Sequence, residues 1–299
     1  MATLAMATAD LRDLTVFSSS GANTTLSTEQ ARTGTYSYKL ASGSGINVLS
    51  FTASSTVYIK FAVYLASNTE ILCAAREGTT NHDYIKIEDL DLTIWRLTSK
   101  VFAKIVPVSN WIVIEFKIVV HNIAGELTLK INGEQVYSAT GLDTRNSGTG
   151  VVDNIIFYTS FGGVAYLDDI VVDDANWPGL GGLEVLRPSD DGHYTDWDAG
   201  GHADVADDSD ATYVATDAEV AAKHSFALPT LAADRKTPTA TGLFTKSQLS
   251  GAGAGTLRPF FRKSTTDTPG DSQALSTSLA WAHNFHAQLP DEVGLEVVV

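Results

Sequence analysis

The sequence predicts an all-β protein made of two tandem β-sandwich domains. Apolar and polar residues alternate with a period of two in many short runs, and amphipathic helical patterns are scarce. A proline- and glycine-rich segment at 177–182 also separates two regions of different composition. Alternation places one face of a strand on a core and the other in solvent, and many short strands are typical of sandwiches and jelly rolls.

The first region, residues 1–176, carries most of the strand signals, and about eleven strands are expected there. Asn132-Gly133 lies between two alternating runs and predicts a type I′ hairpin, because that turn needs positive φ at both central residues. Trp111 opens the longest run and is expected in the core. The clearest runs are 36–40, 57–65, 84–87, 111–120, 127–131, 155–158 and 164–172.

Residues 177–182 contain Trp177, Pro178 and three glycines, and this composition predicts a linker. Residues 183–299 alternate less regularly and are expected to form a second, smaller β-sandwich. Strands are expected near 183–186, 212–215, 239–245, 257–262, 274–281 and 294–299.

The charge balance limits the partners that the protein can have. The chain has 35 acidic and 20 basic residues, which gives a formal net charge of −15. Nucleic acids and anionic membranes both need a cationic surface, so neither is expected as a partner. No apolar run reaches the roughly 18–20 residues of a membrane span, and the first residues lack a leader pattern. We expect a soluble protein made in the cytoplasm.

Four short sequence motifs follow one another along the first region. They are Gly34-Thr-Tyr36-Ser-Tyr38-Lys-Leu40, the run 111–116, the hairpin at 129–133 and the closing run 166–172. In this order the region resembles the concanavalin A-like, or laminin-G-like, jelly roll. The resemblance covers about 160 residues and implies a lectin-like sandwich.

The second region looks like a C-terminal β module of tailed-phage virion proteins. The segments that carry this resemblance are 183–188, 208–214, 257–259, 275–279 and 293–297. The stretch 281–290 departs from the family, because it is shorter than usual. The resemblance implies a virion surface protein, either a capsid decoration protein or a tail or fibre component, made in the host cytoplasm. Its expected partners are other virion proteins, further copies of itself, with a trimer as one fitting state, and a cell-surface glycan.

A free carbohydrate-binding protein or a glycoside hydrolase is the alternative function. Hydrolases of this fold class present paired carboxylates on one strand. The nearest acidic run, 88–93, lacks the required glutamates and fits a turn between strands better. No catalytic residue is therefore predicted, and the protein is expected not to be an enzyme.

Sugar binding uses aromatic platforms with polar neighbours. His82, Tyr84 and Trp95 form one candidate platform, and Tyr194 and Trp197 form another. Packing of these rings in the core or at a subunit contact is the competing interpretation.

No cofactor is expected, apart from the option of a structural calcium ion. Calcium binds carboxylates, and Asp168 and Asp169 are the candidate ligands. Solvated charge at a strand end is the alternative. Cys73, the single cysteine, is expected to be a buried apolar side chain.

Overall fold

The computed structural model divides into two compact units, Met1–Glu184 and Val185–Val299. It describes residues 3–9, 17, 23–41, 43, 47–67, 70–96, 98–146, 148–159, 163–183, 185–206, 213–216, 222–229, 241–248, 255–278, 280–286 and 290–298. Among these residues, no helix has the length and apolar character needed to cross a membrane.

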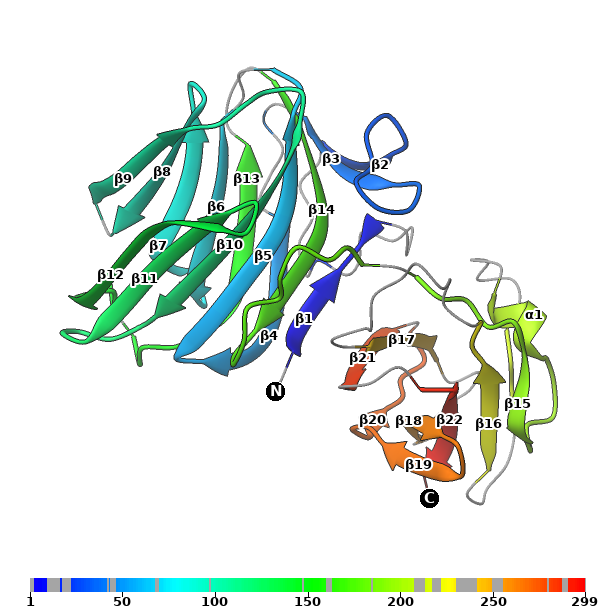
Figure 1. Ribbon diagram of the computed structural model, residues 1–299. Helices are drawn as coiled ribbons and strands as arrows, with labels where there is room; N and C mark the ends of the chain where they lie inside the picture. The colour runs from blue at the N-terminus through cyan, green and yellow to red at the C-terminus, as the bar shows by residue number, and fades with distance from the viewer. Residues whose placement is uncertain are drawn as a thin grey trace. The chain divides into compact units, whose positions relative to one another are not determined.

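The first unit is a sandwich of two antiparallel sheets, as the sequence predicts. One sheet has the strand order β12-β11-β10-β5-β14-β3-β2, with β1 also paired to β14. Figure 1 shows this sheet in front. Its strands are β1 (Thr3–Ala7), β2 (Thr24–Ser27), β3 (Ser37–Ala41), β5 (Thr56–Leu65), β10 (Trp111–Val119), β11 (Gly125–Ile131), β12 (Glu134–Leu142) and β14 (Val164–Asp173).

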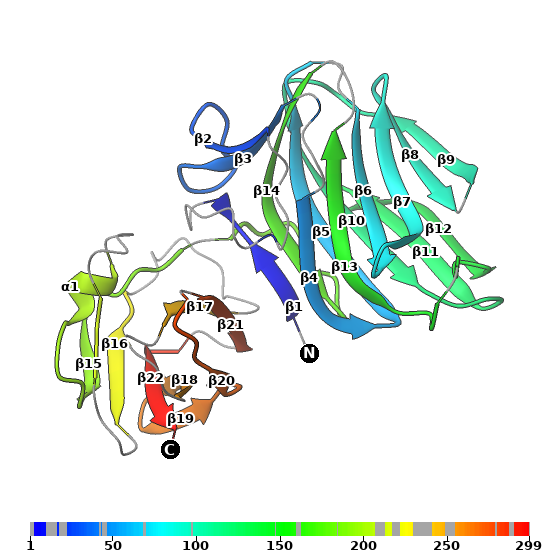
Figure 2. The same ribbon diagram turned by 180° about the vertical axis from the view of Figure 1, so that it is seen from behind.

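The second sheet of this unit has six strands in the order β4-β13-β6-β7-β8-β9. It faces the viewer in Figure 2. Its strands are β4 (Asn47–Ser54), β6 (Ile71–Glu77), β7 (Thr80–Glu88), β8 (Asp91–Arg96), β9 (Ser99–Ile105) and β13 (Val152–Thr159). The described part of the first unit thus holds fourteen strands, three more than the sequence suggested.

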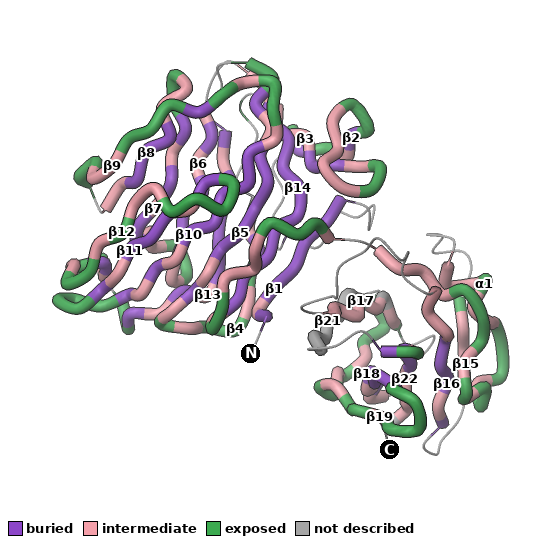
Figure 3. Tube along the Cα trace, in the orientation of Figure 1, coloured by how far each residue is buried: buried purple, intermediate pink, exposed green. Residues whose placement is uncertain are grey.

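The core lies between the two sheets because alternate residues of each strand point inward. In β5, all five odd-numbered positions from Val57 to Leu65 are buried, and Figure 3 shows the central strands as the most buried part of the unit. Phe61 meets Phe157 of the opposite sheet with ring centroids 5.1 Å apart.

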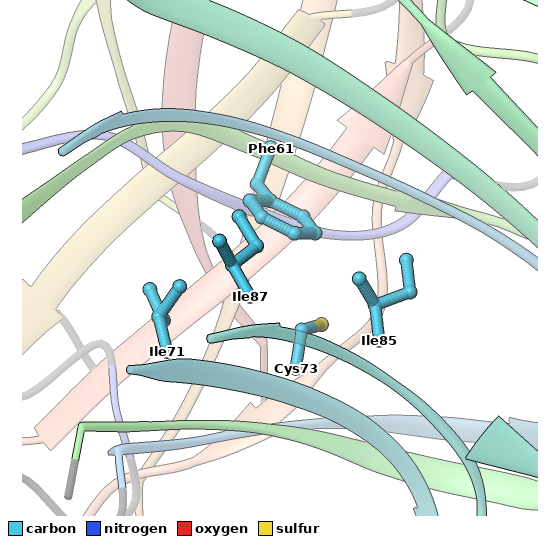
Figure 4. A pocket seen from close by; sticks show the side chains of 5 residues that line it. All are labelled: Phe61, Ile71, Cys73, Ile85 and Ile87. Carbon is cyan, nitrogen blue, oxygen red and sulfur yellow. The ribbon is translucent and has the colours of Figure 1, made fainter. Parts of the chain in front are cut away.

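The packing around Phe61 leaves little free space. In Figure 4, Ile71, Cys73, Ile85 and Ile87 of the six-stranded sheet lie on one side of its ring. The space left between these side chains is too small for a water molecule. The described side chains around Phe61 therefore pack without room for a water molecule.

Two tight turns lie where the sequence predicted them, one at Asn132-Gly133 and one in the acidic run 88–93. Asn132 and Gly133 have φ of 50° and 84°, as the predicted type I′ hairpin between β11 and β12 requires. Asp89 and Leu90 have φ of 52° and 67° and join β7 to β8 in the same way. The acidic run at 88–93 is thus a hairpin turn and does not display a row of carboxylates on one strand.

The segment predicted as a linker packs on the first unit. We call residues 177–183 the strap; in Figure 1 it crosses the outer face of the eight-stranded sheet after β14. Trp177 packs edge-on against Tyr58, with centroids 5.1 Å apart, and the Lys130 ammonium lies 3.8 Å from the centre of the Trp177 ring. Gly182 is needed at its position because a Cβ there would lie 2.1 Å from Thr33 Cγ2.

Four charged side chains hold the backbone of the strap. Glu115 Oε1 accepts the Gly179 N–H at 2.8 Å, Arg32 Nη2 donates to the Leu180 carbonyl at 2.6 Å, Lys60 Nζ donates to the Gly181 carbonyl, and Asp169 Oδ1 accepts the Leu183 N–H at 2.6 Å. Hydrogen bonds to charged groups are stronger than neutral ones. The contact with Asp169 also explains why Leu183 does not begin the strand expected at 183–186.

The second unit is also built from antiparallel sheets. A sheet in the order β15-β16-β22-β18-β19, with β20 paired to β18, accompanies a two-stranded sheet of β17 and β21. The elements are β15 (Asp190–Thr195), α1 (His202–Val205), β16 (Lys223–Ala227), β17 (Thr241–Ser247), β18 (Thr256–Lys263), β19 (Thr266–Pro269), β20 (Gln273–Ala274), β21 (Ala280–His286) and β22 (Glu292–Val298).

Candidate functional site

Strands β7 and β8 bring Tyr84 and Trp95 together on the outer face of the six-stranded sheet. The two residues are direct partners in the antiparallel register. Their neighbours Ile85 and Ile94 point into the core, so both rings point outward. The ring centroids are 6.0 Å apart, the planes lie within 6° of parallel, and both side chains are half-buried. Two of the three residues of the first predicted platform, Tyr84 and Trp95, thus lie side by side on this face.

Polar groups continue the surface along β7 and β8. Trp95 Nε1 donates to Thr93 Oγ1 at 3.0 Å, and that hydroxyl donates to the Lys86 carbonyl at 2.9 Å. Lys86 Nζ lies 3.1 Å from Glu70 Oε1 and 2.9 Å from Glu88 Oε2. Thr93 therefore fixes the indole, and a partly exposed ion triad lies beside the rings.

His82 does not belong to this surface. It is 1% exposed, Asn146 N donates to its Nδ1 at 3.3 Å, and its Nε2 lies 2.9 Å from the Val151 carbonyl. A ring that accepts at Nδ1 carries its proton on Nε2 and donates to Val151. A register shift between Ala74 and Arg76 occurs opposite this part of β7. His82 thus anchors the loop before β13 and cannot stack on a ligand.

Asp168 and Asp169 lie side by side at a bulge in β14, where Asp169 has a φ of 53°. Asp168 accepts the backbone N–H groups of Arg32, Thr33 and Asp169 at 2.8–3.1 Å. Asp169 binds the Arg32 guanidinium, the Thr33 hydroxyl and the Leu183 N–H. Burial is the main cause that raises the pKa of Asp168 to about 7, and the adjacent Asp169 adds to it.

These two residues do not fit a calcium site. Their oxygens already accept protein donors, and the positive charge beside them comes from Arg32 and Lys60. Burial lowers the pKa of Lys60 to about 8, an effect that Asp169 and Glu115 oppose. No group of three or more potential metal ligands occurs in the described part of the chain. The network holds the strap.

Tyr194 of the second unit lies in an ionic cluster. Its hydroxyl donates to Asp267 Oδ2 at 2.9 Å, and its ring packs edge-on against Phe260 with centroids 5.8 Å apart. Lys223 and Arg262 both bind Asp267 and lie 4.9 and 5.1 Å from the centre of the Tyr194 ring. Much of the polar capacity of Tyr194 is therefore used within the protein.

Trp197 contacts the other face of β16. Its ring centroid is 5.9 Å from that of His224, while Tyr194 lies near Lys223. Because adjacent residues of a strand point to opposite faces, the structure does not bring Tyr194 and Trp197 into one platform. The cluster near Tyr194 and the environment of Trp197 are separate features of the second unit.

Sequence reasoning missed a second aromatic pair. Trp111 was expected in the core, but it is half-buried and points outward beside Tyr64, with ring centroids 5.7 Å apart. Ile112 takes the inward position. The signal was present in the alternation, because Ile112, Ile114, Phe116 and Ile118 form the inward set and place Trp111 on the outer face.

Comparisons with known proteins support no specific identity. No family model and no curated protein matches the chain. The alginate lyase Aly36B is 13% identical with a TM-score of 0.40, and the match covers 59% of this chain and 94% of that one. A sialidase gives 7% identity, a TM-score of 0.43, 58% of this chain and 19% of its own.

A glycoside hydrolase family 131 catalytic domain from Coprinopsis cinerea gives 10% identity and a TM-score of 0.39, covering 55% of this chain and 85% of that one. Values this low transfer no activity or substrate. The strands and sheets themselves define the class: an all-β protein whose first unit is a β-sandwich of the jelly-roll type.

Proposed function

We propose that the protein is a non-enzymatic glycan-binding protein and that Tyr84 and Trp95 form its sugar platform. The observation that carries this proposal is the half-buried, nearly parallel pair of rings on an outer sheet face. Sugar rings present apolar C–H faces and polar edges, so they suit aromatic surfaces with polar neighbours. Lys86, Glu70 and Glu88 supply those neighbours here.

The same geometry favours binding over hydrolysis. A glycosidase places the reacting sugar oxygen between two carboxyl groups. Glu70 and Glu88 both contact Lys86 Nζ, so the ammonium occupies the space between them. The nearest carboxylate pair is thus arranged as an ion triad, which holds the polar edge of the platform in place.

We also propose that the protein acts on the surface of a tailed-phage particle, as a capsid decoration protein or a tail or fibre component. The order of the segments in residues 183–299 supports this, and so does the net charge of −15, which suits neither nucleic acid nor membrane partners. Cryo-electron microscopy of purified particles would locate the chain. Its absence from particles would leave a free glycan-binding protein.

The glycan proposal is tested with an array of neutral and acidic oligosaccharides, followed by calorimetric titration of the ligands found. Trp95→Ala is expected to weaken binding about tenfold or more, because losing one stacked ring costs about 1.4 kcal/mol. Trp197→Ala is the matched control in the second unit. Loss of binding in Trp197→Ala alone would move the site to that unit, and unchanged binding in Trp95→Ala would refute the platform.

A further inference from the structure

A row of three aromatic side chains crosses the outer face of the eight-stranded sheet. Trp111 pairs with Tyr64 across β10 and β5, and Tyr64 pairs with Tyr166 across β5 and β14. The ring centroids of these pairs are 5.7 and 5.9 Å apart. Tyr166 is 4% exposed and supports the row from one side, while Tyr64 and Trp111 are half-buried and reach the surface.

The strap leaves this pair uncovered. On β5 and β10, the strands that carry this pair, the described contacts of the strap are with Tyr58, Lys60 and Glu115. Lys60 lies four residues from Tyr64, which is about 13 Å along a strand. The eight-stranded sheet therefore has a covered part beneath the strap and an open part at Tyr64 and Trp111.

The groups around the open pair are polar but carry little net charge. Ser109 and Asn110 precede Trp111, and Ser109 N donates to the Leu65 carbonyl at 2.8 Å, which fixes this loop beside Tyr64. At the other end of the row, Lys39 Nζ lies 2.7 Å from Glu29 Oε1, so their charges cancel. Glu29 also accepts the Tyr166 hydroxyl.

We infer that Tyr64 and Trp111 form a second binding surface, on the outer face of the eight-stranded sheet, for a neutral oligosaccharide. The aromatic faces take the C–H faces of the sugar, and Ser109, Asn110 and the balanced Lys39–Glu29 pair face its hydroxyl groups. An acidic sugar finds no unpaired cation among these groups. The inference shares only its ligand class with the proposed function, because it uses different residues on a different sheet.

The two aromatic pairs make the first unit bivalent. The inner faces of the sheets pack against each other, so the outer faces with Tyr84–Trp95 and Tyr64–Trp111 point in opposite directions. One molecule then holds two glycan chains at once, and on a dense glycan surface the second contact raises the overall avidity without new interactions.

Calorimetric titration of the full chain with a linear neutral hexasaccharide of β-linked glucose tests the inference. The expected stoichiometry is two ligands per chain for the unaltered protein and one for Trp111→Ala. Trp95→Ala is also expected to bind one, and the double variant none. Trp111→Phe keeps a ring and is expected to retain two. Tyr64→Leu keeps apolar volume and is expected to retain one, which separates ligand loss from misfolding.

The outcomes distinguish this inference from the proposed function. One ligand in the unaltered protein, lost in Trp95→Ala and kept in Trp111→Ala, overturns the second surface and leaves the first. One ligand that is lost only in Trp111→Ala supports the second surface and refutes the first. Binding of a galacturonate hexasaccharide at Trp111, with no binding of the glucose hexasaccharide there, overturns the neutral ligand class.

Discussion

At the scale of single residues, burial of Cys73 inside the sandwich suppresses the reactivity of its thiol. It is 3% exposed in β6 and lies among Phe61, Ile71, Ile85 and Ile87. Burial raises the pKa of its thiol well above the usual range, which suppresses the reactive thiolate. The position was predicted correctly from its apolar neighbours, as a small buried side chain.

Because the thiolate is scarce and shielded, we expect Cys73 to react with a thiol reagent such as Ellman's reagent only when the first unit unfolds. The labelling rate should follow the unfolded fraction across a urea titration. Cys73→Ala provides the unlabelled baseline. Fast labelling in native buffer, before any change in the far-ultraviolet circular dichroism, would contradict the packing described for β6.

At the scale of elements, the strap depends on one close approach. A Cβ on Gly182 would lie 2.1 Å from Thr33 Cγ2 and 3.4 Å from Asp169 Oδ1, whereas a Cβ on the neighbouring Gly181 would meet nothing within 4 Å. These two glycines therefore form a matched pair for substitution, because a Cβ at Gly182 would meet the sheet and a Cβ at Gly181 would meet no neighbouring atom.

Gly182→Ala is expected to lower the unfolding free energy of the first unit by about 1–3 kcal/mol, the usual cost of overpacking. Gly181→Ala is expected to leave it nearly unchanged. Urea denaturation followed by circular dichroism measures both. Equal effects of the two substitutions would show that the strap does not pack on Thr33.

The contacts of the strap could not be predicted from the sequence, whereas the strands and hairpins could. The alternation in β5 and β10 and the Asn132-Gly133 turn are local signals, so the sandwich, its hairpins and the outward position of Tyr84 and Trp95 could be predicted. The partners of His82 and Asp169 lie 69 and 137 residues away in the chain. Neither composition nor spacing reveals contacts of that kind, so the buried anchor and the ionic network appeared only in the structure.

At the scale of the whole molecule, a buried histidine makes the second compact unit sensitive to acid. His224 of β16 is 3% exposed, and neither of its ring nitrogens has a hydrogen-bond partner among the residues that the structure describes. Burial lowers its pKa below the ordinary value of 6.5, although Asp191 and Asp196 oppose the effect. The folded second unit therefore binds this proton less readily than the unfolded chain does.

It follows that His224 does not reduce the stability of the second unit above pH 6.5, and that it lowers this stability as the pH falls below that value. One proton limits this slope to at most about 1.4 kcal/mol per pH unit. His224→Leu should flatten this slope, while His193→Leu, at an exposed position, should keep it. Calorimetry at several pH values measures the transition of the second unit. An identical slope in His224→Leu would contradict the assignment.

The pairing of β1 with β14 has a consequence for biosynthesis. Thr3 pairs with Asp173, and the strap that completes the outer face of the same sheet ends at Leu183. A ribosome must therefore release nearly the whole first unit before its first strand finds a partner. A chain that stops at 176, the boundary drawn from composition, would lack the backbone that Arg32, Lys60, Glu115 and Asp169 bind. Translation has to pass Leu183 before these four charged side chains can make their hydrogen bonds to the strap.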